Sequence, residues 1–217
     1  MKIPAIALLL IAALAGTAHA QSRSFTAFGG SAYNVPTTLT IRQADLPVIR
    51  LTARYDTKPF GPNAPYYSWR LSFWNAARTR AWEVRQVHHR LFLSNMPPEI
   101  QVFAIHYGYT FLMAGLAWRH GGVIVHVDAG VIVCAPQNTV RGKKLPARGA
   151  GVFDTAYYVS GGGAELAISR EFRISRRWFA AVNAGLLGGF ARVPVVDGKA
   201  DVPNIGLHGQ LGLGVRF

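Results

Sequence analysis

Apolar and polar residues alternate along most of the chain, and the alternation is clearest at its end. From position 204 onward one face carries the apolar residues Ile205, Leu207, Leu211, Leu213, Val215 and Phe217. The other face carries the polar residues Asn204, His208, Gln210 and Arg216. Successive side chains of a β-strand point to opposite faces. A long strand with one apolar and one polar face is typical of a membrane-spanning strand, which has lipid on one side and a lumen on the other.

The same alternation, with breaks at Pro, Gly and Asn, predicts a regular meander of strands. Two weaker segments come first, at 25–33 and 39–43. Eight clearer strands follow at 49–57, 66–75, 81–93, 101–116, 123–134, 157–169, 179–193 and 204–217. We therefore predict an all-β fold, an up-and-down antiparallel transmembrane β-barrel of about 8 strands over residues 49–217. Residues 21–48 are then an N-terminal lead-in; if they instead supply the first strands, the barrel has about 10.

The predicted connections differ in length in a way that supports this arrangement. Bacterial barrels have short periplasmic turns and longer outer loops. If Phe217 ends on the periplasmic side, the connections 75–81, 118–122 and 170–178 are periplasmic, and none of them exceeds nine residues. The outer connections are 58–65, 94–100, 135–156 and 194–203, and they include the longest segments and those richest in Pro and Gly.

The last strand resembles the closing strand of small bacterial outer-membrane β-barrels of eight to ten strands, whose final residue is typically Phe. No specific family within this group is matched by a motif. The resemblance implies a place in the outer membrane of a Gram-negative cell and recognition of Phe217 by the barrel-assembly machinery. A soluble protein of two stacked sheets could show the same alternation, and this alternative stays open here.

The first twenty residues have the composition of a secretory signal. Lys2 precedes an apolar run at 3–14, and small residues end in Ala18-His19-Ala20, which predicts cleavage before Gln21. The run is shorter than the roughly 20 apolar residues of a transmembrane helix. We expect residues 1–20 to be removed during export.

The chain is basic, with 23 Lys and Arg residues against 10 Asp and Glu, a formal charge of +13. Because an exported protein does not meet nucleic acid, the expected anionic partners are outer-membrane lipid and the phosphates of lipopolysaccharide. Basic residues gather where turns are predicted, at Arg78 and Arg80, Arg119 and His120, and Arg173, Arg176 and Arg177. Anchoring at the membrane interface explains these clusters, and a specific binding patch is the alternative. Cys134 is the single cysteine, so no intrachain disulfide can form. Separately, we expect the barrel to be a monomer.

Projection of the alternation inward gives a polar lumen. Its predicted members are Arg70, Glu83, Arg85, His89, His106, His126, Asp128, Glu165, Asn183, His208 and Arg216. Eight strands leave no room for a channel, so these side chains are expected to pair, for example Arg70 with Glu83 and Arg85 with Glu165. In segment 101–116 the apolar residues fall on the face opposite His106.

Four lumen residues are candidates for acid–base chemistry. His89 and His106 are brought close by the 94–100 connection, while His126 and Asp128 share a strand face at spacing i, i+2. The mixture of histidines and a carboxylate is a generic signal, and we expect neither a metal nor a cofactor.

Three functions remain. The first is a structural or surface-interaction barrel without chemistry, which needs nothing further. The second is a lipid A-modifying enzyme, a deacylase or acyltransferase, which needs a nucleophile beside His89 or His106, since the deacylase pattern His-x-Ser is absent from this sequence. The third is a narrow pore, which needs a lumen free of plugging side chains.

Overall fold

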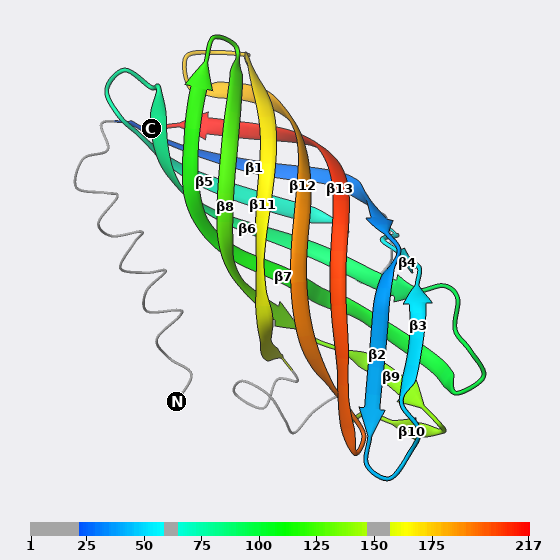
Figure 1. Cartoon of the computed structure of the whole chain (residues 1–217). Helices are drawn as coiled ribbons and strands as arrows, with labels where there is room; N and C mark the ends of the chain where they lie inside the picture. The colour runs from blue at the N-terminus through cyan, green and yellow to red at the C-terminus, as the bar shows by residue number, and fades with distance from the viewer. Residues whose placement is uncertain (1–21, 59–64, 147–156) are drawn as a thin grey trace.

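The structure is a computed structural model that describes residues 22–58, 65–146 and 157–217, so the predicted signal at 1–20 lies outside it. Its 13 strands form one antiparallel sheet (Figure 1). They are β1 Ser22–Val35, β2 Thr37–Gln43, β3 Ile49–Ala53, β4 Tyr55–Asp56, β5 Tyr67–Trp74, β6 Arg80–Leu93, β7 Ile100–His120, β8 Val123–Cys134, β9 Gln137–Val140, β10 Lys143–Lys144, β11 Tyr158–Arg173, β12 Trp178–Val195 and β13 Gly198–Arg216. Within the described ranges, no helix has the length and apolar character to cross a membrane.

Eight of these strands close into a barrel in the order β1, β5, β6, β7, β8, β11, β12 and β13. The ring closes where β1 pairs with β13, from Ser24↔Arg216 to Val35↔Ile205. At the end of this seam the Phe217 amide donates to the Arg23 carbonyl over 3.0 Å, and the Arg23 amide donates back over 2.9 Å. The predicted all-β, up-and-down antiparallel barrel of eight strands is confirmed.

The first wall strand is not the one that we predicted. β1 lies within the lead-in segment 21–48, while segment 49–57 forms β3 and the short β4 instead of crossing the barrel. β2 and β3 make a hairpin that points Leu39, Ile41 and Ile49 into an apolar core. A hairpin with one buried face alternates as a wall strand does, so period alone could not separate the two.

The predicted outer loop 194–203 is also wrong. β12 and β13 continue through it and are joined at Val196 and Asp197, where Asp197 has a left-handed φ of 58°. β2 pairs with the start of β13, and β9 pairs with β7. We call the part of the sheet made by β2, β3, β9, β10 and the adjoining ends of β12 and β13 the lobe (Figure 1). The chain termini of the barrel lie at the opposite end, with the short β5–β6, β7–β8 and β11–β12 turns.

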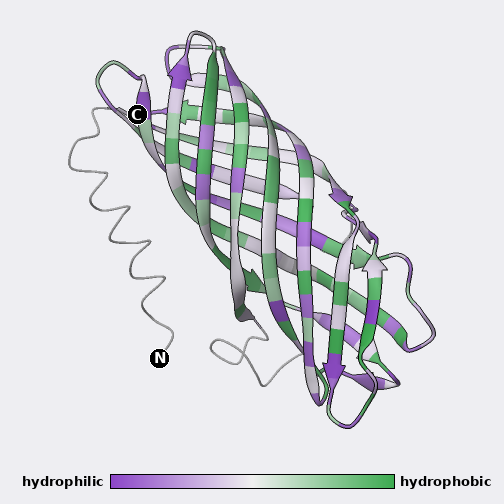
Figure 2. Ribbon diagram, viewed as in Figure 1, coloured by the Kyte–Doolittle hydropathy of each residue, from purple (hydrophilic) through white to green (hydrophobic). Residues whose placement is uncertain are grey.

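The barrel has an apolar outside and, in the half nearer the chain termini, a polar inside. Hydrophobic and hydrophilic residues alternate along its strands in Figure 2. On β8, Val123 and Val127 point outward as predicted, while His126 and Asp128 are buried. On β13 the outward residues Ile205, Leu207, Leu211 and Leu213 are between 43% and 70% exposed. Large apolar side chains on the surface around a polar interior are characteristic of transmembrane β-barrels.

β7 corrects a further expectation. Its apolar residues Phe103, Ile105, Tyr109, Phe111 and Met113 point into the barrel and are at most 3% exposed. We had placed them opposite the lumen because apolar residues on a wall strand normally face lipid. Alternation shows which residues share a face, but it does not show which face is inside when part of the lumen is itself apolar.

Replacing outward-facing Val127 with Arg should destabilise the folded barrel by about 2–4 kcal/mol, because a charge near the bilayer midplane is poorly solvated. The matched control is Val123→Arg on the same face beside the β7–β8 turn, where the cost should be about 0–1 kcal/mol. Urea titration of the protein folded into lipid vesicles, followed by tryptophan fluorescence, measures both. Equal costs for the two variants would show that this face does not meet lipid.

Candidate functional site

Polar side chains fill the half of the lumen nearer the chain termini. Arg85 Nε lies 2.5 Å from Glu165 Oε2, and both side chains have no exposed surface. Arg70 Nε lies 3.4 Å from Glu83 Oε2, also inside the barrel. These are the two ion pairs predicted from the sequence. A buried charge without a partner is energetically costly. In each pair the arginine and the glutamate therefore offset each other's cost of burial.

His126 lies at the centre of a buried hydrogen-bond relay. Its Nδ1 is 2.7 Å from Glu83 Oε2, and its Nε2 is 2.7 Å from Ser169 Oγ and 3.1 Å from Arg70 Nη1. Since a guanidinium can only donate, Nε2 accepts and Nδ1 donates its proton to Glu83. Hydroxyl, imidazole and carboxylate therefore stand in the order of a nucleophile, a base and an orienting acid.

Ser169 was missed by the sequence analysis because it belongs to no motif and lies 43 residues from His126. The available signal was positional. Ser169 lies on the inward face of β11, and β11 pairs with β8, where Ser169 is opposite Ile124. Register was needed to bring the two side chains together, and alternation alone does not provide it.

The relay is enclosed by side chains. A cavity of only about 10 Å³ lies beside it, lined in part by Phe28, Trp74, Ser169 and Phe179, which is space for about one water molecule. Towards the chain termini, Glu171 accepts hydrogen bonds from Arg119 and Arg216 over 2.9 and 2.8 Å. The same guanidinium groups lie 4.8 Å from the Trp74 ring and 4.6 Å from the Phe179 ring. These contacts close this mouth of the barrel.

Asp128 is buried on the same face of β8 as His126, as predicted. Neither of its carboxylate oxygens has a hydrogen-bond partner in the described part of the chain, so Asp128 stands outside the relay. Gly115 on β7 is paired with it, and a Cβ there would lie 2.3 Å from Asp128 Oδ1. The carboxylate thus occupies the space that the glycine leaves.

His89 joins wall strands instead of activating a nucleophile. Its Nε2 is 2.8 Å from Asn34 Oδ1, and Asn204 Nδ2 donates to the same oxygen over 2.9 Å. The Tyr66 ring lies edge-on at 5.5 Å from the imidazole. The partner of His89 is therefore an amide oxygen, which has no nucleophilic role. The side chain of His106 lies outside the described residues, so its predicted approach to His89 stays untested.

The half of the lumen nearer the lobe is apolar. Tyr109, Phe111 and Met113 of β7 belong to the same apolar core as Leu187 of β12. The β2–β3 hairpin contributes Leu39 and other residues to this core. Polar relay and apolar core together fill the lumen over the described residues. These buried side chains count against the open passage that the pore hypothesis requires.

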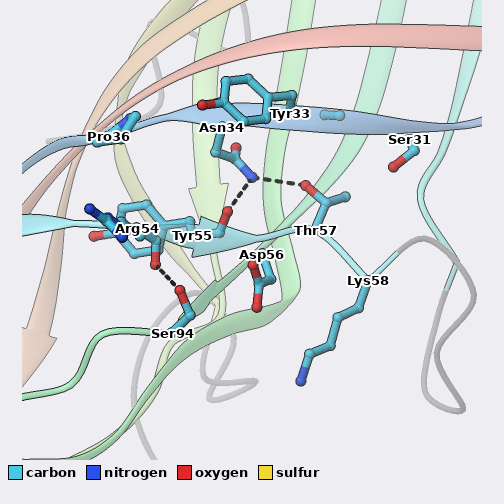
Figure 3. Close-up of a pocket in the computed structure, with 11 residues that line it drawn as sticks. Ser31, Tyr33, Asn34, Pro36, Arg54, Tyr55, Asp56, Thr57, Lys58 and Ser94 are labelled. Carbon is cyan, nitrogen blue, oxygen red and sulfur yellow. Dashed lines mark hydrogen bonds between the residues drawn. The ribbon is translucent and has the colours of Figure 1, made fainter.

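A larger hollow of about 600 Å³ lies at the rim of the barrel (Figure 3). We call it the rim pocket. Ser31, Tyr33 and Asn34 of β1 line one side, and residues 54–58 with Ser94 line the other. It exists because pairing of β1 with β5 stops at Gly29↔Tyr67, whereas β1 continues to Val35 beside β13.

Comparisons with known proteins find similar solved structures and no matching family. No family model and no curated protein match the chain. Among solved structures, it is similar to the outer membrane protein OprG from Pseudomonas aeruginosa (10% identity, 92% of this chain and 97% of that one, TM-score 0.49). It is also similar to the outer membrane protein AlkL in DMPC lipid bilayers (11%, 92% and 92%, TM-score 0.46). A third is Ail, the attachment invasion locus protein of Yersinia pestis (11%, 90% and 99%, TM-score 0.39).

The resemblance to small outer-membrane barrels that we drew from the closing strand is confirmed in its fold by the eight-stranded ring of this structure, and no specific family is matched. Identities of 10–11% and TM-scores below 0.5 transfer no residue role and no activity to this chain.

The buried pair of Arg85 and Glu165 gives a test of the lumen network. Arg85→Met should destabilise the barrel by about 3–5 kcal/mol, because it leaves the Glu165 carboxylate buried with its cation removed. The double variant Arg85→Met with Glu165→Leu should recover much of that loss, since it removes both charges. Urea titration in vesicles measures each, and a double variant whose cost equals the sum of the two single costs would contradict the pairing.

Proposed function

We propose that this protein is an outer-membrane β-barrel with a sealed lumen, which acts as a structural or surface-interaction protein. One observation carries the proposal: side chains fill the described lumen from the Glu171 contacts to the apolar core, while apolar residues cover the outside. A barrel built in this way gives the membrane a rigid wall and presents its lobe on one side. It has no need of a transported substrate.

The proposed orientation places the chain termini in the periplasm and the lobe outside the cell. The short turns at the terminal end and the long β1–β5 and β8–β11 connections at the other end support it, because bacterial barrels show this asymmetry. In this orientation the closing strand ends at Phe217, which we propose as the contact with the barrel-assembly machinery. Export by a signal cut before Gln21 belongs to the same proposal.

Basic residues at the terminal end support contact with lipid headgroups. Exposed arginines lie at the turns and strand ends around this rim, and they are Arg23, Arg80, Arg170, Arg173, Arg176 and Arg177. Glu171 at the same end is already engaged by Arg119 and Arg216. Trp82 and Trp178, each 48% exposed, lie between this rim and the apolar belt. Arginines and tryptophans at this level suit the anionic interface of a membrane.

A lipid A-modifying enzyme is the second candidate, and the Ser169–His126–Glu83 relay is the observation that favours it. Two features count against it. The adjacent cavity is far smaller than an acyl chain, and Arg70 donates to the same His126 nitrogen that a general base would use.

The sealed barrel should not conduct ions. We expect purified protein in planar lipid bilayers to show no steady conductance under voltage, because no water-filled path crosses the lumen. A general porin reconstituted in the same bilayers is the control. Steady single-channel steps that scale with the amount of folded protein would contradict the proposal.

The enzyme alternative has its own test. A fluorophosphonate probe, which reacts with activated serines, should leave Ser169 unlabelled in the folded protein, because the probe cannot enter the enclosed relay. Mass spectrometry of the labelled protein, with Ser169→Ala as the control, reports the modification. Labelling of the wild type that this variant abolishes would establish a reactive serine and favour the enzyme.

A further inference from the structure

We propose that the rim pocket binds a phosphorylated sugar, either as the headgroup of an outer-leaflet glycolipid or free in solution. The inference rests on the proposed function for its orientation, which places the pocket at the outer leaflet. The location of the site and the class of ligand both follow from the side chains that line the rim pocket in Figure 3.

The level of the pocket along the barrel suits a headgroup. Tyr33 pairs with Leu207, and Val35 pairs with Ile205, which is the last exposed apolar residue of β13 on the lobe side. Beyond it, Arg192 and Asp201 pair across β12 and β13 and form an exposed ion pair. The pocket thus lies where the apolar belt ends and charged surface begins, the depth at which sugars and phosphates of a glycolipid are found.

The wall of the pocket is held in place by hydrogen bonds, buried at Asn34 and exposed at Arg54. Asn34 Nδ2 donates to the Tyr55 carbonyl over 3.0 Å and to Thr57 Oγ1 over 2.9 Å, which ties β1 to the opposite side (Figure 3). Ser94 Oγ donates to the Arg54 carbonyl over 3.0 Å, and the Arg54 amide donates to Asn95 Oδ1 over 2.8 Å. A wall fixed in this way loses little conformational entropy when a ligand binds.

The groups that face the pocket suit both parts of the ligand. Arg54, Asp56 and Lys58 alternate with buried Tyr55 and Thr57, so their exposed side chains share one face. Within the described ranges, neither Arg54 nor Lys58 has a carboxylate within ion-pair distance, and Lys58 Nζ lies 4.7 Å from the Phe92 ring. Two cations that form no ion pair among the described residues, with Asp56 between them on the same face, are available for phosphate.

The remaining groups suit a sugar. The Asp56 carboxylate can accept hydrogen bonds from sugar hydroxyls, and the Ser31 hydroxyl can both donate and accept them. The Tyr33 ring is 66% exposed at the edge of the pocket and offers an apolar face with a polar tip. A phospholipid phosphate would use the cations and leave these groups unused. A neutral sugar would leave the cations unused, so the set as a whole favours a ligand that carries both.

The test is native mass spectrometry of the folded protein in detergent, titrated with bisphosphorylated lipid A, with the same lipid after phosphatase treatment, and with phosphatidylglycerol. We expect the first to bind at least about tenfold more tightly than the other two, since only it has phosphate and sugar together. Arg54→Gln with Lys58→Gln should weaken lipid A binding by about tenfold. The control Arg50→Gln with Lys199→Gln removes equal charge from exposed positions of the lobe and should change it less than about twofold.

Competition with glucose 1-phosphate separates the two sources. If glucose 1-phosphate displaces lipid A, the pocket recognises the phosphorylated sugar alone. If lipid A stays bound, the pocket requires the membrane-bound glycolipid. Unchanged binding by the pocket variant, an equal loss in the control, or equal binding of phosphatidylglycerol would overturn the inference. Heat-modifiable migration and absence of conductance, measured on the same samples, show whether the barrel itself is as proposed, so failure of the pocket alone leaves the proposed function standing.

Discussion

Inside a lipid bilayer no water is available for an unpaired backbone amide, and a sheet can exist there only if it has no free edge. In this protein the pairing of β1 with β13 removes that edge. It runs from Ser24↔Arg216 to Val35↔Ile205, and the paired backbone groups of Arg23 and Phe217 extend it to the end of the chain. Because the seam joins the two ends of the chain, the wall is complete only when the last strand is in place. Both the interior and the rim follow from this closure.

Closure with eight strands makes the interior too narrow for a channel, so inward side chains must satisfy one another. Apart from Asp128, whose carboxylate oxygens lack a hydrogen-bond partner among the described residues, the chain meets this demand in two ways. Near the termini it places charges in compensating contacts, with Glu165 between Arg85 and His208 and Glu83 between Arg70 and His126. Near the lobe it uses an apolar core. A triad-like relay can therefore arise simply because Ser, His and Glu are good partners for one another in a closed space.

The fold class could be predicted from sequence because lipid on one side and a packed interior on the other impose a period of two on every wall strand. The wall position of β8 and the pairs of Arg70 with Glu83 and Arg85 with Glu165 followed from that rule. The rule does not identify the strand that meets β13, so it predicts a lead-in where β1 lies and a wall strand at 49–57. It also gives no register, which is why neither the contact of Ser169 with His126 nor that of His89 with Asn34 could be predicted.

The rim pocket shows how closure and surface chemistry are connected. β1 must reach Val35 to seal the seam with β13, but β5 begins only at Tyr67, so the pairing of β1 with β5 stops at Gly29 and does not include the far part of β1. The Asn34 side chain bridges this gap to Tyr55 and Thr57, and in doing so leaves a hollow open to the outside. A gap in a membrane wall is tolerable only at the level where water or headgroups can satisfy the backbone. The unequal lengths of two neighbouring strands therefore create, at the headgroup level, a preformed polar site that the filled lumen could not provide.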